Sequence, residues 1–170
     1  MSDSPLAHNG PLLPGTRLPS HFHECYGCGP ELDFGLQLET EVGEAGTVIG
    51  GFIVTDAHQG ASGLIHGGVL AAAFDEVLGA LSWLTRVPAV TARLETDFRR
   101  PVPIGTDLRF EARIDSEEGR KSWRSAVATF ADGREVARAQ GLFVQVPRDH
   151  FNRHRHITST DQRSEATSHD

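Results

Sequence analysis

The sequence has no surplus of basic residues, only two cysteines and no long apolar run free of charge. Lys and Arg number 16 against 23 Asp and Glu, which gives a formal net charge of −7 at pH 7. A general nucleic-acid binder would show a basic surplus or stripe, so we expect no nucleic-acid partner. Because no 18-residue apolar stretch lacks a charge, we also expect no membrane span.

The scarcity of cysteine bears on the compartment. Two cysteines are too few to serve as a disulfide scaffold in a chain of 170 residues. The opening residues "MSDSPLAHNG" lack a basic region followed by an apolar one, so we expect no secretory signal. These features predict a reducing, cytoplasmic location.

Polar segments flank one predicted domain. We interpret residues 1–24, rich in Pro, Gly and Ser over most of their length, as a partly ordered arm. Residues 148–170 are polar and rich in histidine, which is typical of a disordered tail. Residues 25–147 remain as the domain and are enough for a hydrophobic core.

Alternating apolar and polar residues dominate the domain. In "DLRFEARID", residues Leu108, Phe110 and Ile114 share one face, and charged residues occupy the other. The same pattern predicts about six strands, and Asp132-Gly133 is a strong hairpin signal. The predicted strands are 34–42, 47–54, 89–98, 107–115, 121–131 and 135–146. The connections are mostly short, so we expect an antiparallel sheet.

One segment, from about Gly67 to Leu84, is apolar on nearly every side of a helical projection. Such a helix is buried on most sides. The sequence therefore predicts an α+β fold in which a curved sheet wraps one long helix.

Two adjacent acids interrupt this helix. Neighbouring helical residues point about 100° apart, so Asp75 and Glu76 face different directions. Asp75 shares a row with small residues such as Gly68 and Gly79, where another backbone can approach closely. An unpaired buried carboxylate is costly. Asp75 is therefore either paired structurally or held for a reaction, and both interpretations are open from these residues alone.

The "HGG" triplet opens the helix. Free amides at a helix amino terminus suit a developing oxyanion, which makes the Gly67 N–H a candidate donor. Asp75 lies about 12 Å further along the axis at 1.5 Å per residue, too far to share a carbonyl with Gly67 of the same chain. Two antiparallel copies of the helix would bring them together. If both groups serve one reaction, the active unit is at least a dimer.

The ordered set of segments resembles the hotdog-fold acyl-CoA thioesterases, in the branch related to PaaI-type enzymes and thioesterase superfamily member 4. The resembling segments are "CYGCGPELDFGLQL", "HQGASGLIHGGVLAAAFDEVLG", "VTARLETDFRRPVPIG", "EGRK" and "ARAQGLFVQV". The resemblance implies a homodimer, or a dimer of such dimers, with sites at the interface. It makes Asp75 the catalytic acid and the Gly67 amide the oxyanion donor, with contributions from His66 and Thr91. A hydroxyl at Thr91 is also ordinary for a strand.

One position departs from a neighbouring branch of that family, which uses an Asn where this chain has Gly60. We expect His58 or Gln59 to substitute in holding the thioester or a water. Gly68 and Glu76 complete the residues that we place beside the substrate, although the direction of Glu76 also suits a structural role.

Coenzyme A carries phosphates, so cations near the site matter. Arg99 and Arg100 stand at a predicted strand end, and Arg120 and Lys121 at a turn. We favour Arg100, Arg120 and Lys121 as phosphate ligands. Solvated turn charges are the more common outcome for any single one.

A metal alternative rests on "HFHECYGC". His21, His23, Cys25 and Cys28 could supply four zinc ligands at short spacing. A single tight cluster is a weak signal, and the similar "CYGCGP" segment of the thioesterases has no metal role. We therefore expect a glycine-rich turn and no metal there, and we expect His154 and His156 to be solvated.

The sequence thus predicts an enzyme that hydrolyses an acyl-CoA to free acid and CoA without a metal or redox cofactor. Asp75 would act as general base on water or as nucleophile through an anhydride. An enoyl-thioester hydratase and a non-catalytic acyl-CoA-binding or sensing protein on the same fold are the alternatives. The acyl chain would run past residues such as Phe74, Leu78 and Trp83.

Overall fold

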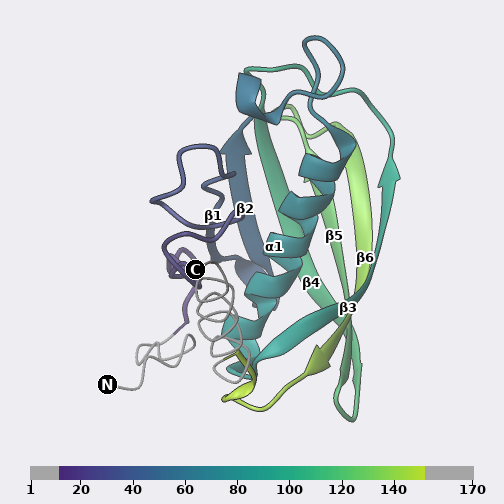
Figure 1. Cartoon of the computed structure of the whole chain (residues 1–170). Helices are drawn as coiled ribbons and strands as arrows, with labels where there is room; N and C mark the ends of the chain where they lie inside the picture. Colours follow the sequence, from purple (N-terminus) through teal and green to yellow (C-terminus); the bar gives the residue numbers. More distant parts are fainter. Residues whose placement is uncertain (1–11, 152–170) are drawn as a thin grey trace, which may run out of the picture.

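The structure is a computed structural model that describes residues 12–151. In this part of the chain six strands form one sheet that curves around the long helix α1 (Figure 1). The elements in chain order are β1 (Glu39–Val42), η1 (Glu44–Gly46), β2 (Val48–Ile53), η2 (Asp56–His58), α1 (Gly67–Thr85), β3 (Ala89–Phe98), β4 (Asp107–Glu118), β5 (Lys121–Thr129) and β6 (Glu135–Gln145).

The sheet has the order β1-β2-β4-β5-β6-β3, and every neighbouring pair is antiparallel. The predicted helix and sheet are therefore confirmed, and the bounds of β3 agree with the prediction. The first strand is shorter than predicted, because it begins at Glu39 and not at residue 34. Gln37 has a φ of 47°, a left-handed conformation that ends extended backbone there.

The core lies between α1 and the concave face of the sheet. Phe74 and Leu78 of α1 are fully buried, and the Phe74 ring packs edge-on against Phe110 of β4 at 5.3 Å between ring centroids. By length and composition α1 is also long and apolar enough to cross a membrane. The sequence analysis expected no such segment, because two acids interrupt this helix. Half of this stretch is buried inside the fold, so packing against the sheet accounts for its apolar character.

Strand β3 forms one edge of the sheet, with β6 as its partner. Strict alternation along "AVTARLETDF" would place Val90, Ala92, Leu94 and Phe98 on one apolar face. A bulge between Thr91 and Arg93 interrupts that alternation, and the Phe98 side chain is 55% exposed. A ten-residue edge strand with an exposed aromatic residue is an available surface for pairing with another chain.

The amino-terminal segment packs beside β1 and α1. Leu18 is buried in the core and its amide donates to the Thr40 carbonyl at 2.8 Å. The described part of the predicted arm thus reaches the hydrophobic core. The rest of the arm, and the histidines His154 and His156 of the predicted tail, lie outside the described residues.

Candidate functional site

Asp75 and Thr91 form a hydrogen-bonded pair. The Thr91 hydroxyl, near the start of β3, donates to Asp75 Oδ1 on α1 at 2.6 Å. This O···O distance is typical of a charge-assisted bond to a carboxylate. Both residues are exposed, so the remaining carboxylate oxygen is open to a water or a ligand.

The start of α1 provides a free amide. His66 is the N-cap residue, and its Nδ1 accepts a hydrogen bond from the Gly68 N–H at 2.9 Å. Gly67 is the first helical residue, so its N–H has no acceptor inside the helix. Because the Gly68 amide is bonded to His66, the exposed Gly67 amide is the one of the two that is available to an oxyanion.

The loop before α1 explains the departure at Gly60. A Cβ added at Gly60 would lie 2.8 Å from His66 Cα and 3.0 Å from its Cβ. The His66 residue thus occupies the space that a side chain at this position would need. Gln59 stabilises the same loop, because its Oε1 accepts a hydrogen bond from the Gly63 amide at 2.8 Å.

His58 does not lie at this site. Its side chain is buried, Nδ1 accepts from the Thr55 amide at 3.1 Å, and its ring packs edge-on against Phe52. The prediction that His58 contacts substrate does not fit this placement. The position is a core histidine whose role is to hold η2.

Glu76 faces the amino-terminal segment, on a different side of α1 from Asp75. Its Oε1 lies 3.1 Å from His21 Nδ1, and the Cys25 thiol lies 3.7 Å from its Oε2. The prediction that Glu76 contacts substrate beside Asp75 does not fit this placement. The 100° step that separates the two acids places them at two separate sites.

Glu76, His21 and the two cysteines shift one another's pKa values. Burial raises the pKa of the Glu76 carboxyl, but its hydrogen bond to His21 and the His21 charge outweigh this and leave the pKa below its usual value. Burial likewise lowers the pKa of His21, yet hydrogen bonds to Cys25 and Glu76 and the Glu76 charge raise it to about 10. A hydrogen bond to Cys28 raises the pKa of the Cys25 thiol to about 12.

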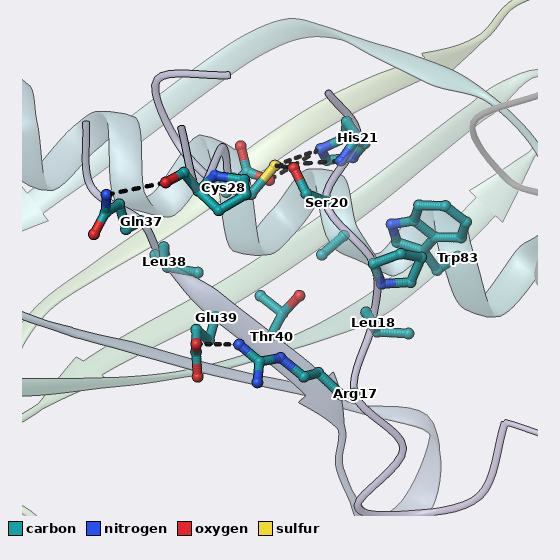
Figure 2. Close-up of a pocket in the computed structure, with 14 residues that line it drawn as sticks. Arg17, Leu18, Ser20, His21, Cys28, Gln37, Leu38, Glu39, Thr40 and Trp83 are labelled. Atoms are coloured by element: carbon teal, nitrogen blue, oxygen red, sulfur yellow. Dashed lines mark hydrogen bonds and ion pairs between the residues drawn. The ribbon is translucent and has the colours of Figure 1, made fainter. Parts of the chain in front are cut away.

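A cavity of about 470 Å³ adjoins this second site. Figure 2 shows His21, Cys28 and Trp83 along its wall, with Leu38 and Thr40 on the opposite side. The cavity is lined by residues of the amino-terminal segment, β1 and α1, and Asp75 is not among them.

The predicted phosphate ligands lie in two places. Arg100 follows the far end of β3, where it donates to the Glu135 carbonyl. Lys121 begins β5 beside Val144, which pairs with Val90 at the near end of β3. From Thr91 to Phe98 the strand covers about 23 Å at 3.3 Å per residue. Within one chain, Arg100 is therefore far from Arg120 and Lys121.

Arg124 is a buried cation that the sequence analysis missed. It lies on β5 and donates to the Leu78 carbonyl at 2.6 Å and to the Ser82 hydroxyl at 3.1 Å, both on α1. Burial lowers the pKa of Arg124 to about 10. The sequence contains a signal for this burial, because the alternation of "KSWRSAVATFA" puts Arg124 on the same face as Ala126 and Ala128.

Comparison with known proteins finds similarity to thioesterases. A family model described as the thioesterase superfamily matches residues 62–137. Acyl-coenzyme A thioesterase THEM4 of Bos taurus is 35% identical over 89 residues, and THEM5 of Mus musculus is 30% identical over 89 residues. Each match covers 52% of this chain and 36% of the relative, so the chain spans just over a third of the length of these proteins.

Solved structures show the same architecture. A crystal structure of a thioesterase superfamily protein has a TM-score of 0.68 at 32% identity, covering 72% of this chain and 60% of the other. The PaaI protein of E. coli, from the phenylacetic acid degradation operon, has a TM-score of 0.62 at 19% identity, covering 66% and 81%. Six antiparallel strands around one central helix are shared with these neighbours.

Proposed function

We propose that this protein hydrolyses the thioester of an acyl-CoA to a free acid and CoA, because residues 62–137 match a model of the thioesterase superfamily and the chain shares its fold with solved thioesterases. The single observation that carries the proposal is the 2.6 Å hydrogen bond between Thr91 and Asp75 at an exposed seam of α1. Support comes from the acyl-coenzyme A thioesterases that the chain resembles.

The chemistry needs few groups, because a thioester carbonyl is already electrophilic. In the general-base route Asp75 takes a proton from water while the hydroxide attacks the carbonyl carbon. The Gly67 amide stabilises the oxyanion that forms, and the CoA thiolate leaves as the carbonyl is restored. Thr91 fixes the rotamer of the carboxylate through its hydrogen bond. In the nucleophilic route the same carboxylate attacks the carbonyl carbon and expels the CoA thiolate, and water then hydrolyses the resulting anhydride.

The complete site is proposed to form in a homodimer. Gly67 and Asp75 of one chain are about 12 Å apart along the helix axis, too far to act on one carbonyl. An antiparallel pairing about the free edge of β3 would bring the Gly67 end of one chain to the Asp75 end of the other. It would cover Phe98, which is 55% exposed and whose ring would lie 3.5 Å from a Cβ added at Gly67.

The same pairing accounts for the separated cations. Arg100 follows the Phe98 end of β3, whereas Arg120 and Lys121 lie at the Thr91 end. In an antiparallel dimer the Arg100 of one chain approaches Arg120 and Lys121 of the other. Three cations from two chains would then surround one anionic CoA.

The test is a thiol-release assay over a panel of acyl-CoA chain lengths. Wild type is compared with Asp75→Asn, which is close in shape but is neither a base nor a nucleophile. We expect kcat to fall by about 10²–10⁴-fold, the usual contribution of a positioned base. Equal rates for the two proteins would refute the catalytic role of Asp75. Retained acyl-CoA binding with no release by wild type would instead favour a binding or sensing protein.

A further inference from the structure

We infer that His21, Cys25, Cys28 and Glu76 bind a zinc ion. One ligand atom from each of these four residues lies within 4.8 Å of all the others. The first three residues come from one short loop and the fourth comes from α1. Cys25 and Glu76 are 51 positions apart in the sequence. This inference does not depend on the proposed hydrolysis.

The spacing of the ligand atoms fits a tetrahedral ion. With bonds of about 2.0–2.3 Å to zinc, ligand atoms in a tetrahedron lie about 3.3–3.8 Å apart. His21 Nδ1 lies 3.2 Å from Cys28 Sγ and 3.1 Å from Glu76 Oε1. Cys25 Sγ lies 3.7 Å from Glu76 Oε2. The remaining pairs lie within 4.8 Å, so shifts of up to about 1 Å would place all four ligand atoms around one centre.

The backbone of the loop is shaped around this cluster. A Cβ added at Gly27 would lie 2.1 Å from Glu76 Oε2, so only glycine lets the loop approach the carboxylate this closely. A Cβ at Gly29 would lie 2.4 Å from the Cys25 amide nitrogen, and the Gly29 amide closes the turn onto the Cys25 carbonyl at 2.8 Å. Gly29 is thus required by the backbone of the turn, and Gly27 leaves open the space that the Glu76 carboxylate occupies.

Further contacts suit a metal-bound thiolate. Cys28 Sγ accepts hydrogen bonds from the His21 amide at 3.4 Å and from the Ser20 hydroxyl at 3.3 Å, and the latter is drawn in Figure 2. The His21 ring stacks on Trp83 at 6.1 Å between centroids, which fixes its orientation. Donors to a sulfur ligand and a fixed imidazole are the usual surroundings of a metal site.

The donor set selects the type of ion. Two thiols exclude calcium and magnesium, which prefer oxygen ligands, and an iron–sulfur cluster normally needs more cysteines. Both cysteines are free thiols, which metal binding requires. Four protein ligands leave no open position, so the site is structural. Zinc would clamp residues 21–28 to α1, one residue from Asp75, and complete the wall of the 470 Å³ cavity.

The experiment measures metal bound to the full chain, purified without a histidine tag. We expect about one zinc per chain by elemental analysis. Cys25→Ser and Cys28→Ser should lower zinc affinity by at least about 100-fold in competition with a chromophoric chelator. The matched control is His23→Ala, because His23 belongs to the same loop but is exposed and pairs with Glu31. It should keep the affinity of wild type.

Cobalt substitution gives a test that needs no variant. Cobalt bound at this site should show a thiolate charge-transfer band and the strong visible bands of tetrahedral coordination. The inference is wrong if bound cobalt shows no thiolate band. It is also wrong if both serine variants bind zinc as wild type does. A third contrary result would be loss of the metal from the double variant His154→Ala/His156→Ala while the two serine variants retain it.

Discussion

The replacement Thr91→Val isolates the hydrogen bond that carries the proposed function. Valine has nearly the same shape as threonine, so the change removes the hydroxyl that lies 2.6 Å from Asp75 Oδ1 and little else. A hydrogen bond to a charged group contributes about 1.5–3 kcal/mol. Because 1.36 kcal/mol corresponds to a tenfold change in rate, loss of the bond should lower kcat by about 10–100-fold.

The assay is release of the CoA thiol at saturating acyl-CoA, with KM measured in the same series. We expect KM to change little, because Thr91 is proposed to position the carboxylate and not to hold the substrate. The control is Thr129→Val, a threonine on β5 that lies two strands from the edge. In an Asp75→Asn background Thr91→Val should have almost no further effect, since the interaction is already lost. A Thr91→Val enzyme within twofold of wild type would refute the positioning role.

Two further changes test the surroundings of the site. Gly60→Ala puts a Cβ 2.8 Å from His66 Cα, so we expect a loss of about 1–3 kcal/mol in the free energy of unfolding. We also expect kcat/KM to fall. An unchanged denaturation midpoint would contradict the proposed crowding. Arg124→Met removes the donors to Leu78 and Ser82 of α1, so we expect a loss of about 2–4 kcal/mol in urea denaturation. The exposed Arg134→Met serves as its control and should change stability by no more than about 0.5 kcal/mol.

The behaviour of His58 and Glu76 shows where residue patterns stop being informative about a site. A polar residue near a motif can point into the site or away from it, and the sequence spacing is the same in both cases. His58 is only eight positions before His66, yet its ring is buried against Phe52. Glu76 adjoins Asp75 in sequence but contacts His21, because successive helical residues diverge by about 100°.

The metal hypothesis was incomplete for a related reason. The sequence offers His21, His23, Cys25 and Cys28 as a local set, and local spacing alone made zinc a weak prediction. In the cluster proposed to bind zinc, Glu76 of α1 takes the place of His23, which turns outward to Glu31. A ligand that arrives from a distant helix cannot be found from the spacing of the loop.

The sequence by itself determined the elements and their type. Apolar periodicity is a local property, and it located the helix at 67–84 and the edge strand at 89–98 because buried faces must be apolar wherever they pack. The order of "HGG" and Asp75 also predicts, from the rise of a helix, a two-chain site if both groups serve one reaction. Only the tertiary structure decided which polar groups meet: Thr91 with Asp75, Arg124 with α1, and Glu76 with the cysteine loop. Hydrogen bonds and metal bonds act over about 2–4 Å, and residues far apart in sequence come within that range only when the whole sheet closes around the helix.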